Sequence, residues 1–289
     1  MRREVIVPDP VWRLECQLGE GPLWLAERGE LAFVDIKRGH LHLFGVATGE
    51  RRTRDLGGMP SFVVAEEGGA LLVGSGSEVL RLGDGGREVV AVVPQPAHNR
   101  TNDATVDHRG RLWFGTMDDA ETQPSGAIWC LDRGVLHHAG GGAVVTNGPA
   151  VSRDGLLYHV DSGARRIWRH RLGDEPGLGP GELFLELRAE EGFPDGITLD
   201  AEDCLWVGLW DGWAVRRYAP DGRLLAHIRF PCARVTKLAF GGADLATAYV
   251  TTARVGLDEA TLARQPLAGS LFAFKAPVAG TITPKVALR

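Results

Sequence analysis

A single short pattern recurs six times along the chain. Each copy is a turn followed by an apolar stretch rich in β-branched or aromatic residues, and the copies begin at Gly29, Gly69, Gly110, Gly155, Asp203 and Asp244. The starts are 40, 41, 45, 48 and 41 residues apart. Repeats of about 40–50 residues are typical of the four-stranded blades of β-propellers. The sequence therefore predicts an all-β fold, a six-bladed β-propeller.

Other strand signals surround every copy of the pattern. An apolar run and a polar turn precede it, and a further strand follows, as in hairpin-connected sheets. A β-sandwich also contains many short strands, but one template would not recur from end to end. We therefore expect one domain over residues 1–289, closed by pairing between residues 4–7 and 281–288. One helical turn is expected at residues 258–266. Trp113, Trp206 and Trp210 lie in the repeated template, which favours core packing for all three.

The charge pattern argues against nucleic-acid and membrane partners. The net charge is −5, and no Lys/Arg-rich run is present. No apolar run approaches the roughly 20 residues that span a bilayer, and the start of the chain lacks a signal-peptide core. The four cysteines form no CxxC pair, so we expect free, buried thiols rather than a zinc or redox site. These features favour a cytoplasmic protein.

Polar residues keep one offset from the repeated turn. Eight residues before each turn, after correction for one longer turn, stand Glu20, Ser61, Asn102, Asn147, Asp195 and Thr236. Equivalent positions in six blades should form a ring at one mouth of the central channel. Carboxylate and amide oxygens suit a hard divalent ion, which would also relieve repulsion between the two acids. The alternative is that these side chains only bind water and cap strand ends.

At these positions the sequence resembles the sugar-lactonase family of regucalcin (senescence marker protein), gluconolactonases and luciferin-regenerating enzyme. It looks most similar to the bacterial aldonolactonase branch, which includes pentonolactonases such as xylonolactonase. The matching stretches include "LGEGPLW", "NRTNDATVDHRGRLWFGTMD", "TNGPAVSRDGLLYHVDS" and "FPDGITLDAEDCLWVGLWDG", and together they cover nearly the whole chain.

The resemblance implies a six-bladed propeller with one divalent metal ion at the channel mouth. It implies Glu20, Asn147 and Asp195 as metal ligands, and Arg100 and Asn102 as contacts of the sugar lactone. The family also places an acidic substrate contact after the "GTM" motif, which here is Asp119 or Glu121; we assign Glu121. Oxygen ligands admit Ca²⁺, Mn²⁺, Zn²⁺, Fe²⁺ or Mg²⁺.

Together these expectations predict a metal-dependent hydrolase that opens an aldonolactone to the aldonic acid. Asp195 is the candidate general base, while the ion would polarise the lactone carbonyl. No GxSxG, HExxH or P-loop motif occurs, and a lactone needs no covalent nucleophile. One alternative is an aryl-ester or organophosphate hydrolase, which would favour an apolar, aromatic rim. Another is a non-catalytic scaffold or calcium-binding regulatory propeller. The sequence leaves open the lactone, the native ion and the oligomeric state.

Overall fold

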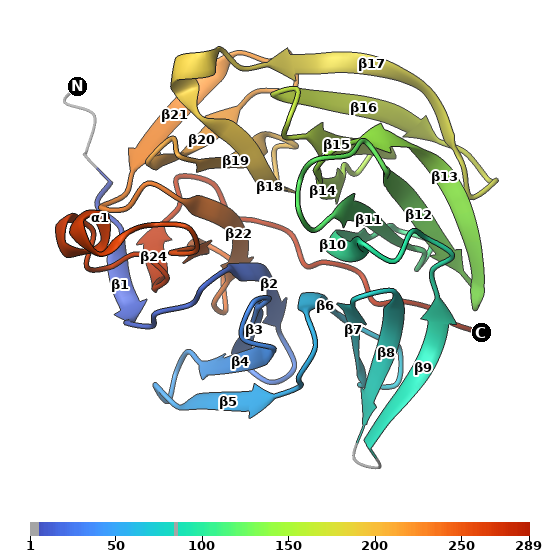
Figure 1. Ribbon diagram of the computed structural model, residues 1–289, viewed down its shortest axis with the longest axis horizontal. Coiled ribbons are helices and arrows are strands. Elements are labelled where there is room, and N and C mark those ends of the chain that lie inside the picture. Colours follow the sequence, from blue (N-terminus) through green and yellow to red (C-terminus); the bar gives the residue numbers. More distant parts are fainter. Residues whose placement is uncertain (1–5, 84–85) are drawn as a thin grey trace.

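A computed structural model describes residues 6–83 and 86–289. Six four-stranded antiparallel sheets surround a central axis, which confirms the predicted six-bladed propeller (Figure 1). Within each of the first five blades the strands follow one another outward from the axis in chain order, joined by hairpin connections. Among the described helices, none is long and apolar enough to cross a membrane.

The first three blades occupy the N-terminal half of the chain. Blade 1 contains β2 (Gly19–Leu25), β3 (Glu30–Asp35), β4 (His40–Gly45) and β5 (Arg51–Asp55). Blade 2 contains β6 (Pro60–Ala65), β7 (Leu71–Ser75), β8 (Glu78–Gly83) and β9 (Gly86–Val92). Blade 3 contains β10 (Asn99–Val106), β11 (Leu112–Asp118), β12 (Gly126–Asp132) and β13 (Val135–Ala143).

The remaining blades follow in chain order. Blade 4 contains β14 (Thr146–Val151), β15 (Leu156–Asp161), β16 (Arg166–Leu172) and β17 (Leu178–Glu186). After the short 3₁₀ helix η1 (Ala189–Glu191), blade 5 contains β18 (Phe193–Leu199), β19 (Leu205–Trp210), β20 (Ala214–Tyr218) and β21 (Leu224–Arg229). Blade 6 contains β22 (Val235–Gly241), β23 (Thr247–Thr252), β24 (Leu271–Lys275) and, as its outermost strand, β1 (Asp9–Trp12).

The ring of blades closes where β1 pairs with β24. Asp9 lies opposite Ala273, and Pro10 lies opposite Phe272. Closure thus pairs N- and C-terminal segments, as predicted, but the predicted partners, residues 4–7 and 281–288, are wrong; residues 4 and 5 lie outside the described residues. Pro10 argued against a strand in this part of the sequence, because proline lacks the N–H group that a central strand donates. An outermost strand tolerates proline because one of its edges needs no hydrogen-bond partner. That the whole chain is one domain stays a prediction.

The C-terminal segment has a different position from the one expected. It bridges several blades: Gly280 pairs with Asp200 of blade 5, and Val286 pairs with Glu66 of blade 2. In Figure 1 this segment runs across the propeller toward the C-terminus. The predicted helical turn is confirmed as α1 (Glu259–Arg264), which Asp258 caps by accepting a hydrogen bond from the backbone N–H of Thr261.

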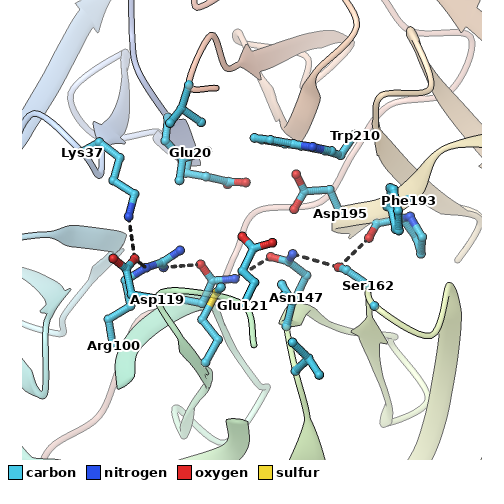
Figure 2. A pocket seen from close by; sticks show the side chains of 18 residues that line it. Glu20, Lys37, Arg100, Asp119, Glu121, Asn147, Ser162, Phe193, Asp195 and Trp210 are labelled. Carbon is cyan, nitrogen blue, oxygen red and sulfur yellow. Dashed lines mark hydrogen bonds and ion pairs between the residues drawn. The ribbon is translucent and has the colours of Figure 1, made fainter. Parts of the chain in front are cut away.

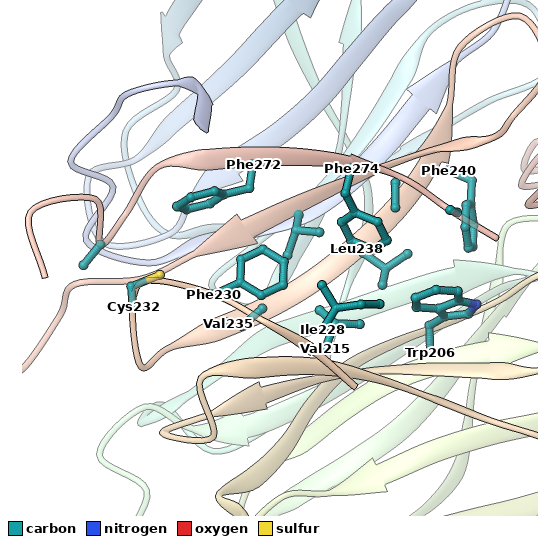
Figure 3. Close-up of a cluster of buried hydrophobic side chains, with 14 residues drawn as sticks. Trp206, Val215, Ile228, Phe230, Cys232, Val235, Leu238, Phe240, Phe272 and Phe274 are labelled. Carbon is teal, nitrogen blue, oxygen red and sulfur yellow. The ribbon is translucent and has the colours of Figure 1, made fainter. Parts of the chain in front are cut away.

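Apolar side chains pack between neighbouring blades. Figure 3 shows one such cluster, in which Trp206 and Val215 of blade 5 meet Phe240 and Phe272 of blade 6. Trp113 and Trp206 are fully buried, as predicted. Trp210 is only half-buried: it packs against the edge of a buried apolar cluster and also lines a pocket, so the core prediction holds for it only in part. The four cysteines are free and buried, as expected.

His42 is a buried histidine next to the closing strand. Its ring lies between Trp12 of β1 and Phe33 of β3, and its Nδ1 atom lies 2.9 Å from the hydroxyl of Thr53. Burial lowers the pKa of His42 to about 4. The unfolded chain should take up a proton there near pH 6.5, so the stability that this histidine contributes at pH 7 is lost as the pH falls.

We expect this single group to lower the free energy of unfolding by about 2 kcal/mol between pH 7 and pH 5. The variant His42→Gln should show a correspondingly smaller decrease over that range. Denaturant unfolding at several pH values measures the effect, and His138→Gln, at an exposed position, is the control. Equal pH dependence in His42→Gln and the wild type would contradict the argument.

Candidate metal and substrate site

Each inner strand carries its predicted ring position near its start. Next to that position the pairing register of every inner strand shifts, for example between Asn147 and Ala150 of β14. Bulges of this kind bend a strand and change the direction of its side chains. A similar irregularity therefore recurs beside the ring position in every blade, as expected for equivalent positions of one repeat.

A pocket of about 410 Å³ opens at this mouth of the channel. Four ring residues line it, Glu20, Asn102, Asn147 and Asp195, and they come from blades 1, 3, 4 and 5 (Figure 2). The structure therefore brings together the sequence-predicted site residues. The same pocket is lined by Arg100, Asp119 and Glu121, the substrate contacts that the family resemblance implied.

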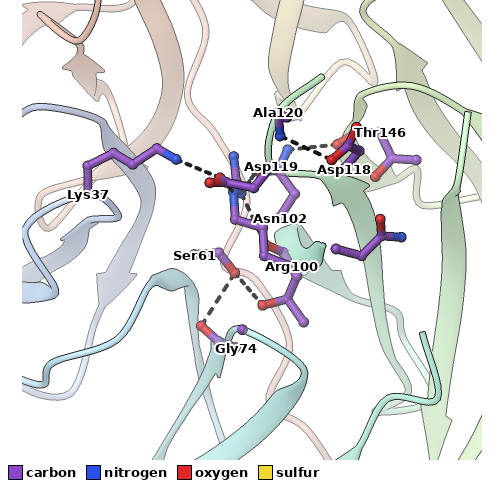
Figure 4. Close-up of polar contacts among 12 residues, drawn as sticks. Lys37, Ser61, Gly74, Arg100, Asn102, Asp118, Asp119, Ala120 and Thr146 are labelled. Atoms are coloured by element: carbon purple, nitrogen blue, oxygen red, sulfur yellow. Dashed lines mark hydrogen bonds and ion pairs between the residues drawn. The ribbon is translucent and has the colours of Figure 1, made fainter. Parts of the chain in front are cut away.

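The other two ring residues hold strands together rather than facing the pocket. The hydroxyl of Ser61 lies 2.8 Å from that of Thr101 in the next blade (Figure 4). The hydroxyl of Thr236 donates to the carbonyl oxygen of Gly19 at 2.7 Å. For these two positions, the alternative of strand capping is the better description.

Two buried carboxylates face one another across the pocket. Glu20 is 5% exposed and Asp195 is 6% exposed. Burial raises the pKa of Glu20 to about 8, with a further contribution from the negative charge of Asp103. Burial also raises the pKa of Asp195, and the charges of Glu20, Asp103 and Glu121 add to this effect. Such clustering of acids in a dry environment is costly unless a cation compensates it.

The donor set fits a hard divalent cation. Glu20 and Asp195 supply carboxylate oxygens, and Asn147 supplies an amide oxygen, which are ligand types that Ca²⁺, Mg²⁺ and Mn²⁺ prefer. In the described part of the chain, one further buried carboxylate oxygen, Oδ2 of Asp103, has no hydrogen-bond partner. An excess of buried oxygen acceptors is the imbalance that a cation and its water ligands would relieve.

A chain of hydrogen bonds runs from the pocket rim to the ring. Lys37 and the Nε atom of Arg100 both donate to Oδ1 of Asp119, at 2.6 and 2.7 Å (Figure 4). Arg100 also donates to Oδ1 of Asn102 at 2.7 Å, and Asn102 donates to Oδ1 of Asn147 at 2.8 Å. Asn102 therefore fixes the orientation of Asn147 in addition to facing the pocket.

The opposite side of Asn147 is also fixed. Its Nδ2 atom donates to the hydroxyl of Ser162 at 3.0 Å, and that hydroxyl donates to the carbonyl oxygen of Pro194 at 2.7 Å (Figure 2). Because Pro194 directly precedes Asp195, this contact couples the two candidate ligands through blades 4 and 5. Sequence reasoning missed Ser162, which lies at the end of the matched stretch "LLYHVDS".

Asp119 and Glu121 differ in their surroundings. The carboxylate of Asp119 is engaged by two cations, whereas the side chain of Glu121 forms no hydrogen bond or ion pair within residues 6–83 and 86–289 (Figure 2). The loop is shaped by Asp118, whose carboxylate accepts hydrogen bonds from the backbone N–H groups of Ala120 and Thr122. Glu121 has a positive φ of 56° in this loop. Its carboxylate is therefore the one available to a ligand.

Apolar side chains form part of the wall. Phe193 and Trp210 lie at the start of β18 and the end of β19, where they pair across the strands (Figure 2). Neither they nor Lys37 were predicted as site residues. Their signal was their position: Phe193 starts the inner strand of its blade, whereas Trp210 ends the second strand of its blade and Lys37 lies just after the second strand of blade 1. The second strand is antiparallel to the inner strand and so ends at the same mouth of the channel.

A second cluster of ligand-type side chains lies outside this pocket. The potential metal-ligand atoms of Cys16, Asp35 and His42 lie within 4.8 Å of one another. The thiol of Cys16 lies 3.8 Å from Nε2 of His42, and both oxygens of Asp35 accept backbone N–H groups, from Gln17 and Leu18. Hydrogen bonding therefore accounts for this arrangement.

Comparisons with known proteins identify the family of this chain. The model of the "SMP-30/Gluconolactonase/LRE-like region" matches residues 18–254. The chain is 34% identical to a 6-deoxy-6-sulfogluconolactonase of Pseudomonas putida, covering 95% of this chain and 96% of that protein. It is also 34% identical to a pentonolactonase of Haloferax volcanii, with 82% of each covered.

A solved structure of a calcium-binding protein, regucalcin from Agrobacterium tumefaciens, superposes with a TM-score of 0.94 at 27% identity, covering 98% of both chains. Sequence and structure thus match over the blades that carry the pocket. The chain belongs to the SMP-30/gluconolactonase/LRE-like family.

Proposed function

We propose that this protein is a metal-dependent hydrolase that opens a sugar-acid lactone to the aldonic acid. The observation that carries the proposal is the convergence of Glu20, Asn147 and Asp195 beside Arg100 and Asn102 in one pocket. Two relatives are named as lactonases of sugar acids, which supports the same reaction type here.

Glu20, Asn147 and Asp195 would hold the ion. A divalent ion bound there supplies Lewis-acid polarisation of the lactone carbonyl and stabilises negative charge on its oxygen. The protein contributes the alignment: Asn102 and Ser162 fix both ends of the Asn147 amide. Asp195 lies in the same pocket and accepts the proton of the attacking water as general base.

Arg100, Asn102 and Glu121 would bind the substrate. Arg100 presents planar donors and is held by Asp119, so it lies ready to bind the lactone's oxygens without a large loss of side-chain freedom. Glu121 can accept hydrogen bonds from sugar hydroxyls. Phe193 and Trp210 provide apolar surface for the carbon face of the ring.

The charged side chains of the lining weigh against the rival enzyme hypothesis. An aryl-ester or organophosphate substrate would favour a purely apolar rim, but here Lys37, Arg100, Asp119 and Glu121 line the pocket together with apolar side chains. The non-catalytic alternative, a calcium-binding regulatory propeller, predicts that added metal raises the melting temperature without lactone hydrolysis. Our proposal predicts that added metal raises both.

Charge in the pocket favours an uncharged lactone. Four carboxylates line it, Glu20, Asp119, Glu121 and Asp195, against the cations Lys37 and Arg100. With all of these groups ionised the lining carries a net charge of −2, so a bound divalent ion would make the pocket neutral. A substrate that carries its own negative charge would meet Glu121 with no free cation to balance it within the described lining.

The first test of this function concerns the metal ligands. Glu20→Gln and Asn147→Ala should each lower metal affinity and lactonase activity by tenfold or more while leaving the fold intact, because water only partly replaces a lost ligand. Calorimetry after chelation measures affinity, and Glu67→Gln, at an exposed position, serves as control. Unchanged affinity in both variants would place the ion elsewhere.

A second test separates the two roles of Asp195. Asp195→Asn keeps one ligand oxygen but removes the basic group. We expect activity to stay about 10²–10⁴-fold below wild type even at saturating metal, as for loss of a general base. Steady-state kinetics over a range of metal concentrations decides this point. Recovery of near-wild-type kcat at saturation would leave Asp195 as a ligand only.

A third test addresses the charge of the substrate. We expect kcat/KM for gluconolactone or xylonolactone to exceed that for 6-phosphogluconolactone by at least about tenfold, which corresponds to about 1.4 kcal/mol. Glu121→Gln should lower this ratio, because removal of one repulsive carboxylate should raise kcat/KM for the phosphorylated lactone. Faster hydrolysis of the phosphorylated lactone would reject the charge argument while leaving the reaction type intact.

A further inference from the structure

A buried ion pair crosses the channel one residue beyond the ring. Lys237 follows Thr236 in β22 of blade 6, and its Nζ atom donates to Oδ1 of Asp103 at 2.5 Å. Asp103 follows Asn102 in β10 of blade 3, on the opposite side of the propeller (Figure 1). The side chains are 8% and 2% exposed. The pair lies outside the lining of the substrate pocket.

The chain leaves space for this crossing next to a candidate ligand. Gly196 directly follows Asp195, and a Cβ atom placed on it would lie 2.4, 2.6 and 2.9 Å from the Cβ, Cγ and Cδ atoms of Lys237. These distances exclude any larger residue without displacement of the lysine. The aliphatic part of Lys237 therefore runs along the backbone that carries Asp195, and its ammonium group reaches Asp103 beyond it.

The pair is electrostatically linked to both candidate carboxylate ligands. The charge of Asp103 raises the pKa values of Glu20 and Asp195, and the charge of Lys237 lowers both. In the described part of the chain, Lys237 satisfies only one oxygen of Asp103, since Oδ2 has no hydrogen-bond partner. The pair therefore contributes to the field at the ring without directly occupying a ligand position.

We propose that the Lys237–Asp103 pair sets the charge of the ion site at −2 and thereby selects divalent over trivalent cations. The proposal rests on the metal site proposed above. Glu20, Asp103 and Asp195 carry −3 when ionised, and Lys237 adds +1. Without the lysine the buried charge is −3, which attracts a trivalent ion more strongly than a divalent one of similar size.

Lys237→Met makes the buried charge around the ion site more negative, and Asp103→Asn makes it less negative. Lys237→Met should raise the ratio of Tb³⁺ affinity to Ca²⁺ affinity by about tenfold, because a unit charge in a low-dielectric site interacts more with +3 than with +2. Asp103→Asn leaves the ammonium group unbalanced and should lower the same ratio by a similar factor. The double variant restores −2 and should return to the wild-type ratio.

Affinities for Ca²⁺ by calorimetry and for Tb³⁺ by luminescence titration give the ratio without measuring activity. Melting temperatures establish that each variant is folded, and Lys275→Met, at an exposed position, is the control. If Lys237→Met does not fold, the other two variants still test the proposal: Asp103→Asn should lower the ratio, and the double variant should keep the wild-type ratio. Ratios within threefold of wild type in the folded single variants would overturn the proposal, and so would a double variant that behaves like Lys237→Met.

The same titrations separate this proposal from the function it rests on. If the Glu20→Gln variant binds Ca²⁺ and Tb³⁺ as tightly as the wild type does, the metal site itself is rejected, and the charge proposal with it. Weakened binding in Glu20→Gln together with unchanged selectivity in the Lys237 and Asp103 variants would reject the charge proposal alone.

Discussion

Buried negative charge is the constraint on which the centre of this propeller depends. Glu20, Asp103 and Asp195 lie within one channel and are each at most 6% exposed. An unpaired buried carboxylate costs several kcal/mol or gives up its charge by binding a proton. Lys237 neutralises the charge of Asp103 by forming an ion pair with it. The carboxylates of Glu20 and Asp195 then require either protons or a bound cation.

The apolar packing between blades makes this polar centre possible. Clusters such as that of Trp206, Phe240 and Phe272 lie between the sheets, away from the axis, and stabilise the ring of blades by burying apolar area. The inner strands can then carry polar residues at their bulged starts. The sheets thus act as a rigid scaffold for side chains that would be unfavourable in an ordinary core.

The repeat made the fold and the ring predictable from the sequence, because blade register converts a constant offset into a common position in space. Glu20, Asn147 and Asp195 follow that rule. The acidic substrate contact after Met117, assigned to Glu121, could not be placed by that rule. Its loop is not part of the repeat and takes its shape from the hydrogen bonds that Asp118 accepts. Lys237 was missed for a different reason: its role depends on a partner in the opposite blade, which no local pattern reveals.

The distinction between an ion-binding propeller and a lactonase depends on residues beyond the ligands. Glu20, Asn147 and Asp195 alone would serve either role, and a shared fold does not decide between them. The proposed lactonase makes use of Arg100, which is held between Asp119 and Asn102, and of the Glu121 carboxylate, which has no side-chain partner among the described residues. An ion bound for structural purposes gains nothing from this arrangement. The organised rim is therefore the feature that favours catalysis, and loss of Arg100 should separate turnover from ion binding.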